Sequence, residues 1–428
     1  MCIRDSLYEK GFLYKGAYEG WYCVHEETYY AESDLEKNEE GEYVCPDCKR
    51  PVQKTSGEEN WFFKLSDFED KLLEFYEENP DFIRPVTRKN EIVSFVKSGL
   101  KDLSISRSTF DWGVPLPFDE GHVAYVWADA LLAYLTGIGY SDPERAAEYE
   151  AAWPMQYHFV GKDIIRFHCV IWPAMLMAIG EALPEHVFAH GFLTVRNAET
   201  GKAEKMSKSR GNVVNPDEIV DVYGADTMRL YEMFIGDFEK AAPWNTSSIK
   251  GCKRFLDRVW NLATEQEHTG EEYSKANEAA VHKAIKKVSE DIEAMKFNTA
   301  IAAMMSLVNA FYTKGSITRG ELRTLTVLLN PFAPHVTEEM WEVEQFGGMV
   351  HEAQWPAFDP AKTKEDTVEI VLQVLGKVRS RMTISADTPK EEVLAAAKAD
   401  SKIAALLEGK TIKKEIYVPG KLVNFVAI

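Results

Sequence analysis

Long apolar runs, cysteines and surplus positive charge are all scarce in this 428-residue sequence. The longest apolar run, CVIWPAMLMAIG (169–180), is shorter than the roughly 20 residues that cross a bilayer. The first residues also lack the apolar core of a leader, so we expect no membrane association. Six cysteines are too few for a disulfide framework, which favours a reduced, cytoplasmic protein. The net charge of −19 argues against a protein that coats nucleic acid, but it allows a local basic surface.

The apolar patterns that are present change in kind along the chain. In 122–140 (HVAYVWADALLAYLTGIGY) and 156–180 (QYHFVGKDIIRFHCVIWPAMLMAIG) a buried strand pattern runs into a helical one. This alternation is typical of a parallel α/β sheet with ligands at the carboxyl ends of its strands. Four amphipathic helical patterns then follow one another between about 243 and 358, which predicts a helical bundle. The last 60 or so residues alternate again and predict a small α+β module.

One short basic stretch, KAEKMSKSRGNVV (202–214), stands out in this acidic chain. Two lysines separated by small residues can approach a triphosphate from one side, and their ammonium groups would stabilise a departing pyrophosphate. Taken alone, a lysine and serine run of this length is equally compatible with a solvated loop. We predict Lys205 and Lys208 as catalytic groups, within an ATP-binding segment formed by Lys205, Met206, Ser207, Lys208 and Ser209.

The full string KMSKSRGNVVNP resembles the second signature of class I aminoacyl-tRNA synthetases. Residues from about 7 to 195 resemble methionyl-tRNA synthetase in the strings GWYCV, CPDC, ENWFFKLS and HFVGKDIIRFHCVIWPAML. Residues from about 204 to 428 are more similar to leucyl-tRNA synthetase, in YGADTMRLYEMFIGDFEKAAPWN, LLNPFAPHVTEEMWE and IYVPGKLVNFVAI. The chain is therefore interpreted as a mosaic of two related families, which is either natural or the product of two joined genes.

The resemblance implies both a fold and a missing part. The fold would be α/β: the second half of a Rossmann-like, HUP-type parallel-sheet catalytic domain with a cysteine-knuckle insert, then an all-α anticodon-binding bundle and a small α+β module. No string like the HIGH signature of this class occurs, so we expect an N-terminally truncated chain with little or no activity by itself. The expected domains are 7–100 (connective insert with the knuckle and return helices), 101–200 (second half of the catalytic domain), 201–242 (KMSKS loop and stem-contact region), 243–362 (anticodon-binding domain) and 363–428 (C-terminal tRNA-contacting module).

The methionyl resemblance also implies an amino-acid site. Trp127, Ala130 and Tyr134 have the spacing of one helix face. Aromatic walls suit a polarisable thioether. Without the resemblance, the same segments would be interpreted as hydrophobic core. The implied methionine site is lined by Trp127, Ala130, Tyr134, Phe167 and His168, and Asp163 would hold the amino group or the adenylate ribose.

The cysteine spacing indicates half of a zinc site. Cys45 and Cys48 form a CxxC on a turn. The methionyl pattern places a second CxxC upstream, where this sequence has Cys23, His25 and Glu26, with glutamate replacing the second cysteine. Three thiolates with His25 or Glu26 could complete a tetrahedral zinc site. A metal-free knuckle held by packing is the alternative.

Basic residues of the first predicted bundle helix and of the C-terminal module are candidates for contact with tRNA. Arg254 and Arg258 are one helical turn apart, so they share a face that either contacts tRNA or is simply solvated. The resemblance implies tRNA contacts by the C-terminal module, where phosphate contacts would make binding depend on salt. Its basic residues are Lys377, Arg379, Arg381, Lys410, Lys413, Lys414 and Lys421.

Together these features predict an aminoacyl-tRNA ligase. The substrate carboxylate would attack the α-phosphate of ATP, bound with Mg²⁺, and the aminoacyl group would then pass to the 3′ end of a tRNA. Methionine is the expected amino acid because the residues of the implied site are methionyl-like, and leucine is the alternative. A tRNA-binding protein without catalytic activity is a further alternative, but such a protein has no need of paired lysines in this loop.

Overall fold

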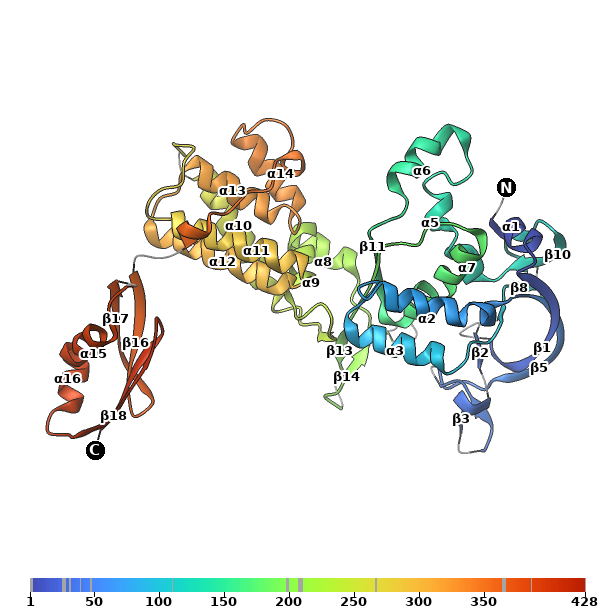
Figure 1. The fold of residues 1–428 in the computed structure, drawn as a ribbon, viewed down its shortest axis with the longest axis horizontal. Coiled ribbons are helices and arrows are strands. Elements are labelled where there is room, and N and C mark those ends of the chain that lie inside the picture. The colour runs from blue at the N-terminus through green and yellow to red at the C-terminus, as the bar shows by residue number, and fades with distance from the viewer. Residues whose placement is uncertain are drawn as a thin grey trace. The chain divides into compact units, whose positions relative to one another are not determined.

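The computed structural model describes residues 3–24, 28–30, 32–38, 40–46, 48–109, 111–197, 200–206, 211–265, 268–363, 367–385 and 387–427. The chain divides into two compact units, one formed by Met1–Phe192 with Glu239–Ala241 and the other by Leu193–Phe238 with Ala242–Ile428. The first unit contains a parallel sheet, and the second contains helices followed by a small sheet module, as the sequence predicted (Figure 1). Among the described residues, no helix has the length and apolar character that crossing a membrane requires.

The first unit begins with a short helix and a long, curved antiparallel pair of strands (Figure 1). Helix α1 (Ile3–Glu9) buries Ile3 and Leu7, which lie one turn apart. The alternation of the following sequence favours strands, and β1 and β5 pair over most of their length with a bulge at Tyr18/Glu19. This sheet has the order β2-β1-β5-β7 and consists of β1 (Leu13–Cys23), β2 (Thr28–Tyr30), β5 (Gln53–Phe63) and β7 (Leu103–Ser104).

A parallel three-stranded sheet forms the centre of the first unit. Its order is β11-β12-β6, and the strands are β6 (Ile83–Arg84), β11 (Tyr157–Gly161) and β12 (His186–His190). Helix α7 (Trp172–Ile179) is apolar on nearly every face, which is why it lies inside the core. Gly180 ends this helix with φ +84, a conformation that glycine adopts without strain. Helices α2 (Glu69–Glu78) and α3 (Val86–Lys97) contribute amphipathic faces to the same core.

The remaining elements of the first unit carry the predicted amino-acid site. Strand β10 (Asp119–Ala124) pairs antiparallel with β8 (Ser106–Arg107) and β9 (Pro115–Leu116). It leads into two short helices, α4 (Val126–Ala130) and α5 (Ala133–Thr136), rather than one continuous helix. After β11 the chain forms a π-helical turn over Phe167–Ile171 before α7 begins.

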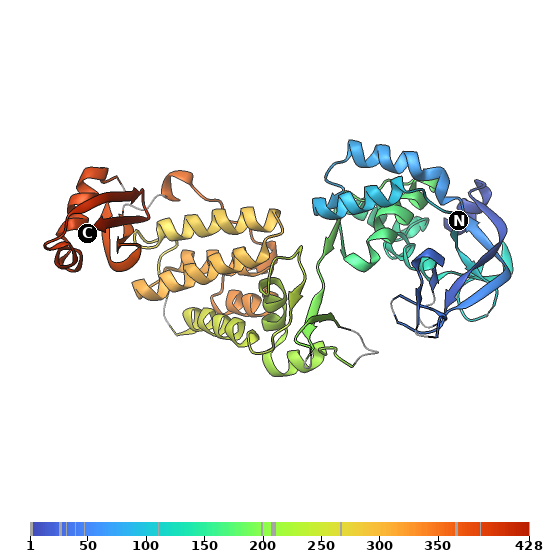
Figure 2. The same ribbon diagram turned by 90° about the horizontal axis from the view of Figure 1, so that it is seen from below.

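The second unit begins with a small sheet and continues as a helical bundle. The sheet order is β14-β13-β15, formed by β13 (Leu193–Arg196), β14 (Ala203–Lys205) and β15 (Ala242–Pro243), and helices α8 (Pro216–Tyr223) and α9 (Ala225–Phe234) lie between β14 and β15 in sequence. Figure 2 shows helices of the bundle, coloured yellow to orange, lying side by side. The fourth helical pattern is divided after Leu329 because prolines 331 and 334 interrupt it. The bundle comprises α10 (Ile249–Thr264), α11 (Glu278–Glu293), α12 (Phe297–Lys314), α13 (Arg319–Leu329) and α14 (Pro334–Val343).

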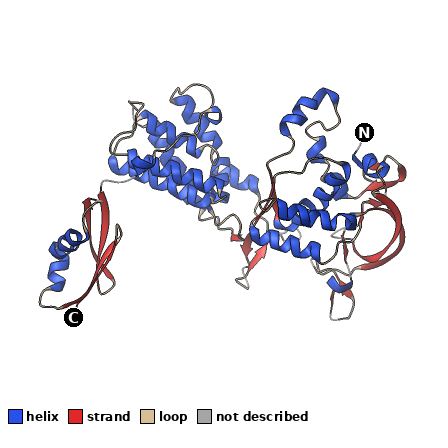
Figure 3. Ribbon diagram, viewed as in Figure 1, coloured by secondary structure: helices blue, strands red, loops and turns tan. Residues whose placement is uncertain are grey.

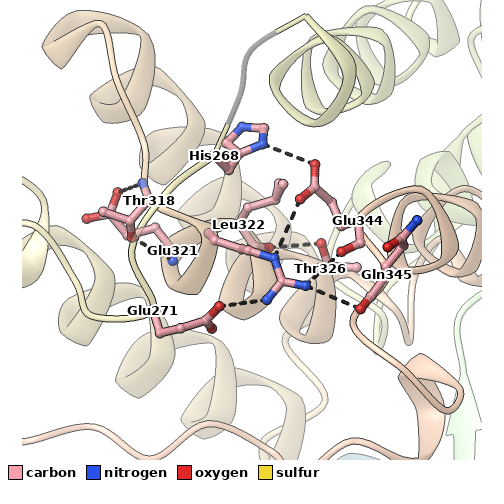
Figure 4. Close-up of polar contacts among 9 residues, drawn as sticks. His268, Glu271, Thr318, Glu321, Leu322, Thr326, Glu344 and Gln345 are labelled. Atoms are coloured by element: carbon pink, nitrogen blue, oxygen red, sulfur yellow. Dashed lines mark hydrogen bonds and ion pairs between the residues drawn. The ribbon is translucent and has the colours of Figure 1, made fainter.

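A polar cluster ties the start of α13 to the loops around it (Figure 4). The Arg319 guanidinium donates to Glu271 at 2.6 Å and to the Glu344 carbonyl at 2.7 Å. Thr318 caps α13 and exchanges hydrogen bonds with Glu321, an arrangement known as a capping box. Glu321 is fully buried, and its carboxylate also accepts from the Ser274 amide and hydroxyl, both at 2.7 Å. These hydrogen bonds satisfy the buried carboxylate and fix the start of α13 to the loop that contains Ser274.

The last part of the chain forms a four-stranded sheet with two helices on one side of it (Figure 3). The strand order is β17-β16-β19-β18, with β16 and β19 parallel. The helices cover the face that presents Ile370, Leu372, Val423 and Phe425, all fully buried. The elements are β16 (Thr367–Val374), β17 (Lys377–Ser385), α15 (Lys390–Ala399), α16 (Ser401–Leu407), β18 (Ile412–Val418) and β19 (Leu422–Ala427).

Candidate functional site

An aromatic cluster lies beside the parallel sheet of the first unit. The rings of Trp127 from α4 and Phe167 from the π-helical turn are stacked, with centroids 4.0 Å apart and an interplanar angle of 15°. His168 meets Trp127 edge to face at 6.1 Å. Trp127 and Phe167 are only half-buried, so their rings form a partly open apolar wall. Such a wall can bind a side chain of similar polarisability, including a thioether.

The hydrogen bonds of His168 define which atoms of this cluster donate. Its Nδ1 lies 3.0 Å from the Ile164 carbonyl oxygen, which can only accept, so Nδ1 carries the proton. Burial lowers the pKa of His168, so the ring is neutral and Nε2 is an acceptor. The Tyr134 hydroxyl, 2.7 Å away, therefore donates to Nε2. This pair holds both side chains in one orientation.

A second buried histidine adjoins the first. His158 from β11 is 3% exposed and packs against Tyr134 with ring centroids 4.4 Å apart. Burial, and then the neighbouring His168, lower the pKa of His158 to about 4. Its Nε2 is buried and has no hydrogen-bond partner among the residues the structure describes. His158 is thus neutral, and the burial of its unpaired Nε2 beside the cluster lowers the stability of the fold.

The structure brings together four of the six residues predicted for the amino-acid site: Trp127, Tyr134, Phe167 and His168. Ala130 is exposed at the end of α4, and the buried alanine of that helix is Ala128. The break between α4 and α5 interrupts the single helix face that the spacing predicted.

The sixth predicted residue, Asp163, lies just beyond the carboxyl end of β11, in the short 3₁₀ helix Lys162–Ile164. The position where a Cβ at Gly161 would lie is 2.6 Å from the Asp163 carboxylate. A larger residue at 161 would therefore displace this carboxylate. This position of Asp163, directly after a strand, agrees with the general rule that ligands of open α/β sheets bind beyond the carboxyl ends of the strands.

Arg107 is a buried cation that the sequence analysis did not select. It is 6% exposed, and its guanidinium lies 4.5 Å over the ring of Tyr125, two residues before Trp127. Its Nη1 donates to the Ser104 hydroxyl at 3.0 Å and to the Ser106 carbonyl at 2.7 Å. Arginine is rarely buried without a functional or structural partner. Arg107 is the last residue of β8, and no motif of the sequence analysis includes it.

A serine, a histidine and an aspartate near Arg107 have the composition of a hydrolytic triad but not its exposure. His122 Nδ1 lies 3.1 Å from the Ser106 hydroxyl, and His122 Nε2 lies 3.6 Å from Asp119. Ser106 is fully buried, and its hydroxyl accepts from the Trp61 amide at 2.8 Å. Hydrogen bonds from Lys15 and Trp61 lower the pKa of Asp119 to about 2. These groups stabilise the fold, because no substrate can reach the serine.

Three thiols converge in the knuckle. The sulfur atoms of Cys23, Cys45 and Cys48 all lie within 4.8 Å of one another, and Cys23 and Cys48 are 3.5 Å apart. Partial burial and the two neighbouring thiols raise the pKa of Cys48 to about 11. The cluster fits zinc, which binds thiolates at about 2.3 Å in a tetrahedron and therefore needs sulfurs at roughly this separation. The predicted fourth ligand, His25, lies outside the described residues.

The KMSKS segment follows a hairpin of the second unit. Strand β14 pairs antiparallel with β13, and Lys205 lies opposite Thr194. Lys205 is exposed and Met206 is half-buried. The remaining predicted residues of the segment, Ser207, Lys208 and Ser209, lie outside the described residues. Gly211, the next described residue, has φ +64, a value that glycine adopts without strain.

The two arginines of α10 have different surroundings. Arg258 donates to the Asn309 side chain at 2.8 Å and lies 4.5 Å over the ring of Tyr312, so it is bound to α12. Arg254 is exposed, and its guanidinium has no ion pair or hydrogen bond among the described residues. Of the pair, Arg254 is therefore the better placed to meet a phosphate.

Comparison with known proteins identifies two families. A model described as tRNA synthetases class I (M) matches residues 2–263, more than half of the chain. A second, described as the anticodon-binding domain of tRNA ligase, matches residues 278–394. The chain is 38% identical over 407 residues to the methionine–tRNA ligase of Caldanaerobacter subterraneus (85% of this chain, 61% of the relative). It is 52% identical over 258 residues to that of Clostridium tetani (60% and 37%) and 53% identical over 238 residues to the leucine–tRNA ligase of Alkaliphilus oremlandii (56% and 29%). The chain thus spans between 29% and 61% of the length of these relatives.

Solved structures agree with the family assignment. Mycobacterium tuberculosis methionyl-tRNA synthetase bound by methionyl-adenylate matches with a TM-score of 0.69 and 32% identity, covering 79% of this chain and 73% of that one. The ternary complex of Agrobacterium radiobacter LeuRS, tRNA and LeuAMS has a TM-score of 0.67 over 100% of this chain and 82% of that one. Its identity of 18% shows a shared fold alone.

Proposed function

The chain belongs to the class I aminoacyl-tRNA synthetases, and we propose that it is a methionine–tRNA ligase. The observation that carries the choice of amino acid is the aromatic cluster of Trp127, Phe167, His168 and Tyr134, in which the Tyr134 hydroxyl and His168 Nε2 are already paired with each other. A thioether needs no hydrogen-bond donor and gains from contact with aromatic rings. The names of the relatives support the choice of methionine, because two of the three relatives compared above are methionine–tRNA ligases.

In the proposed reaction, the methionine carboxylate attacks the α-phosphate of ATP, the bond to pyrophosphate breaks, and methionyl-adenylate forms. The aminoacyl group is then transferred to the 3′ end of tRNA. Lys205 and Lys208 would neutralise charge on the departing pyrophosphate. Magnesium bound with ATP would neutralise part of the remaining phosphate charge. Asp163 would bind the substrate amino group or the adenylate ribose, and no protein nucleophile is needed.

The same proposal assigns roles outside the reaction site. Zinc bound by Cys23, Cys45 and Cys48 with His25 would stabilise the knuckle, whose own hydrophobic core is small. Arg254, with Arg258 beside it, and the basic strands of the C-terminal module would contact tRNA phosphates. The proposed activity places the protein in the cytoplasm, where tRNA is used.

Leucine is the second candidate substrate, and one observation favours it: a relative that is 53% identical over 238 residues is a leucine–tRNA ligase. Leucine has no sulfur, so stacked aromatic walls offer it area but no sulfur–aromatic contact. The two candidates therefore differ in their dependence on Trp127 and Phe167.

Isothermal titration calorimetry with methionine and with leucine distinguishes the candidates. We expect methionine to bind and leucine to bind at least tenfold more weakly. Trp127→Ala removes one wall and should weaken methionine binding at least tenfold, whereas the matched control Trp112→Ala, at an 87% exposed tryptophan, should leave it unchanged. Tighter binding of leucine would replace this proposal with the leucine one. Binding of tRNA with neither amino acid bound would favour a non-catalytic tRNA-binding protein.

A further inference from the structure

A cavity of about 620 Å³ opens on the second unit, where strands β13 and β15 meet helix α9 and the segment that leads into α10. This volume falls within the roughly 300–1,000 Å³ of ordinary ligand pockets. Three aromatic rings, one arginine and two hydroxyl groups line it: Tyr231, Phe234, Trp244, Arg196, Thr246 and Ser248. None of these residues belongs to the amino-acid site or to the KMSKS segment.

The Trp244 ring is held in one orientation by its neighbours. Its Nε1 donates to the Thr246 hydroxyl at 3.0 Å, and its backbone amide donates to the Thr194 carbonyl at 2.7 Å. Tyr231, which is buried, meets the indole edge to face at 5.0 Å. The indole is nevertheless half-buried rather than buried, so part of its surface is open to the cavity. A ring that is already ordered loses little conformational entropy when a ligand stacks on it.

Arg196 supplies the charge of the cavity. It is the last residue of β13, it is exposed, and its guanidinium has no ion pair or hydrogen bond among the described residues. The same small sheet carries Lys205, which lies opposite Thr194. A positive guanidinium beside an open indole is the combination that recognises a nucleotide, because the ring stacks on the base and the arginine pairs with the phosphate.

We propose that this cavity binds one unstacked nucleotide of the tRNA, with its base against Trp244 and its phosphate on Arg196. This inference rests on the proposed function, since it adds a binding site for the same RNA partner. An unstacked base fits better than a duplex, because a duplex hides the flat faces of its bases in the stack. The apolar side of the cavity, formed by Phe234 and Ile235, would cover the edge of the base.

The test is equilibrium binding of fluorescently labelled bulk tRNA by the whole chain over a series of KCl concentrations. Trp244→Leu removes the aromatic face but keeps apolar bulk, and we expect it to weaken binding at least about fivefold. Trp244→Phe keeps a stacking ring and should bind close to wild type. Arg196→Ala should lower the slope of log K against log[KCl] by about one, because one phosphate contact is lost. The control is Lys314→Ala, which removes an exposed cation at the end of α12.

Each outcome has a distinct meaning. The inference is wrong if Trp244→Leu and Arg196→Ala both bind tRNA as tightly as wild type and with the same salt slope. That result would leave the proposed function intact. Failure of the wild-type chain to bind tRNA would instead contradict the proposed tRNA partner. Adenosine monophosphate serves as a second probe. If Trp244→Leu abolishes binding of this mononucleotide but does not affect tRNA, the cavity is a site for free nucleotides and the inference is wrong. Ultraviolet cross-linking of tRNA to the peptide that contains Trp244 would support it.

Discussion

Replacement of His158 by phenylalanine should make the first unit less sensitive to acid. His158 is 3% exposed, and its pKa is lowered from 6.5 to about 4, first by burial and then by His168. The folded state therefore binds a proton less readily than the unfolded state. Between pH 6.5 and pH 4 the unfolded chain is protonated at this site while the folded chain is not, so stability falls as the pH falls through this window.

The size of the effect follows from the two pKa values. One pKa unit corresponds to about 1.4 kcal/mol, so the whole window is worth about 3 kcal/mol, of which about 2 kcal/mol is lost between pH 7 and pH 5. Phenylalanine fills a similar volume and cannot be protonated. His168, whose pKa is also lowered by burial, keeps its own contribution in the variant. We therefore expect His158→Phe to lose about 2 kcal/mol less than wild type over this range.

Urea denaturation at pH 7 and pH 5, followed by near-ultraviolet circular dichroism, measures the difference. The aromatic cluster around His158 gives this signal a strong contribution from the first unit. The matched control is His351→Gln, at an exposed histidine, which should show the wild-type dependence on pH. An equal loss of stability in wild type and His158→Phe between pH 7 and pH 5 would refute the reasoning.

Three further predictions concern particular contacts. Glu321→Ala leaves the buried Asn277 amide and the half-buried amide and hydroxyl of Ser274 without their acceptor, so the bundle should lose at least about 3 kcal/mol of stability, measured by urea denaturation followed by far-ultraviolet circular dichroism. Glu342→Ala, at an exposed glutamate, should cost little. Asp226 accepts from the first backbone amides of α14, at 2.6 Å for the nearer one, so Asp226→Ala should cost about 1–2 kcal/mol in the same assay, and no loss would contradict its role as a cap. Cys45→Ser should remove zinc from the purified protein, as measured by atomic emission, whereas Cys252→Ser, in α10, should retain it; equal zinc content in both would show that the knuckle is not the metal site.

Helix and strand patterns were predictable from the sequence because they depend on neighbours a few residues apart. The apolar spacing in α10, α11 and α12 indicates one buried face each, and the structure buries those faces. The interruptions were less predictable. Helix α5 is separate from α4 although no proline or glycine lies between them, and the chain forms a π-helical turn before α7 that no local pattern indicates.

The candidate sites also differ in how far apart their residues lie in the sequence. The CxxC of Cys45 and Cys48 and the lysines of the KMSKS string lie close together in sequence, so their chemistry was visible there. The approach of Cys23 to the other two thiols, and the stacking of Trp127 on Phe167, join residues more than twenty positions apart. Such pairs depend on sheet register and on the packing of α7.

By itself, the sequence determined the family, the order of a parallel-sheet part, a helical part and a small sheet module, and the motifs whose members are near neighbours. Only the tertiary structure decided that Arg107 and His158 are buried, that Arg258 is bound to α12 while Arg254 is exposed, and that Arg196 and Trp244 share a cavity. The physical reason is that helix and strand periods are local properties of the backbone. Burial, pKa and shared cavities arise where distant segments meet, and their energies depend on contacts that no single stretch of sequence contains.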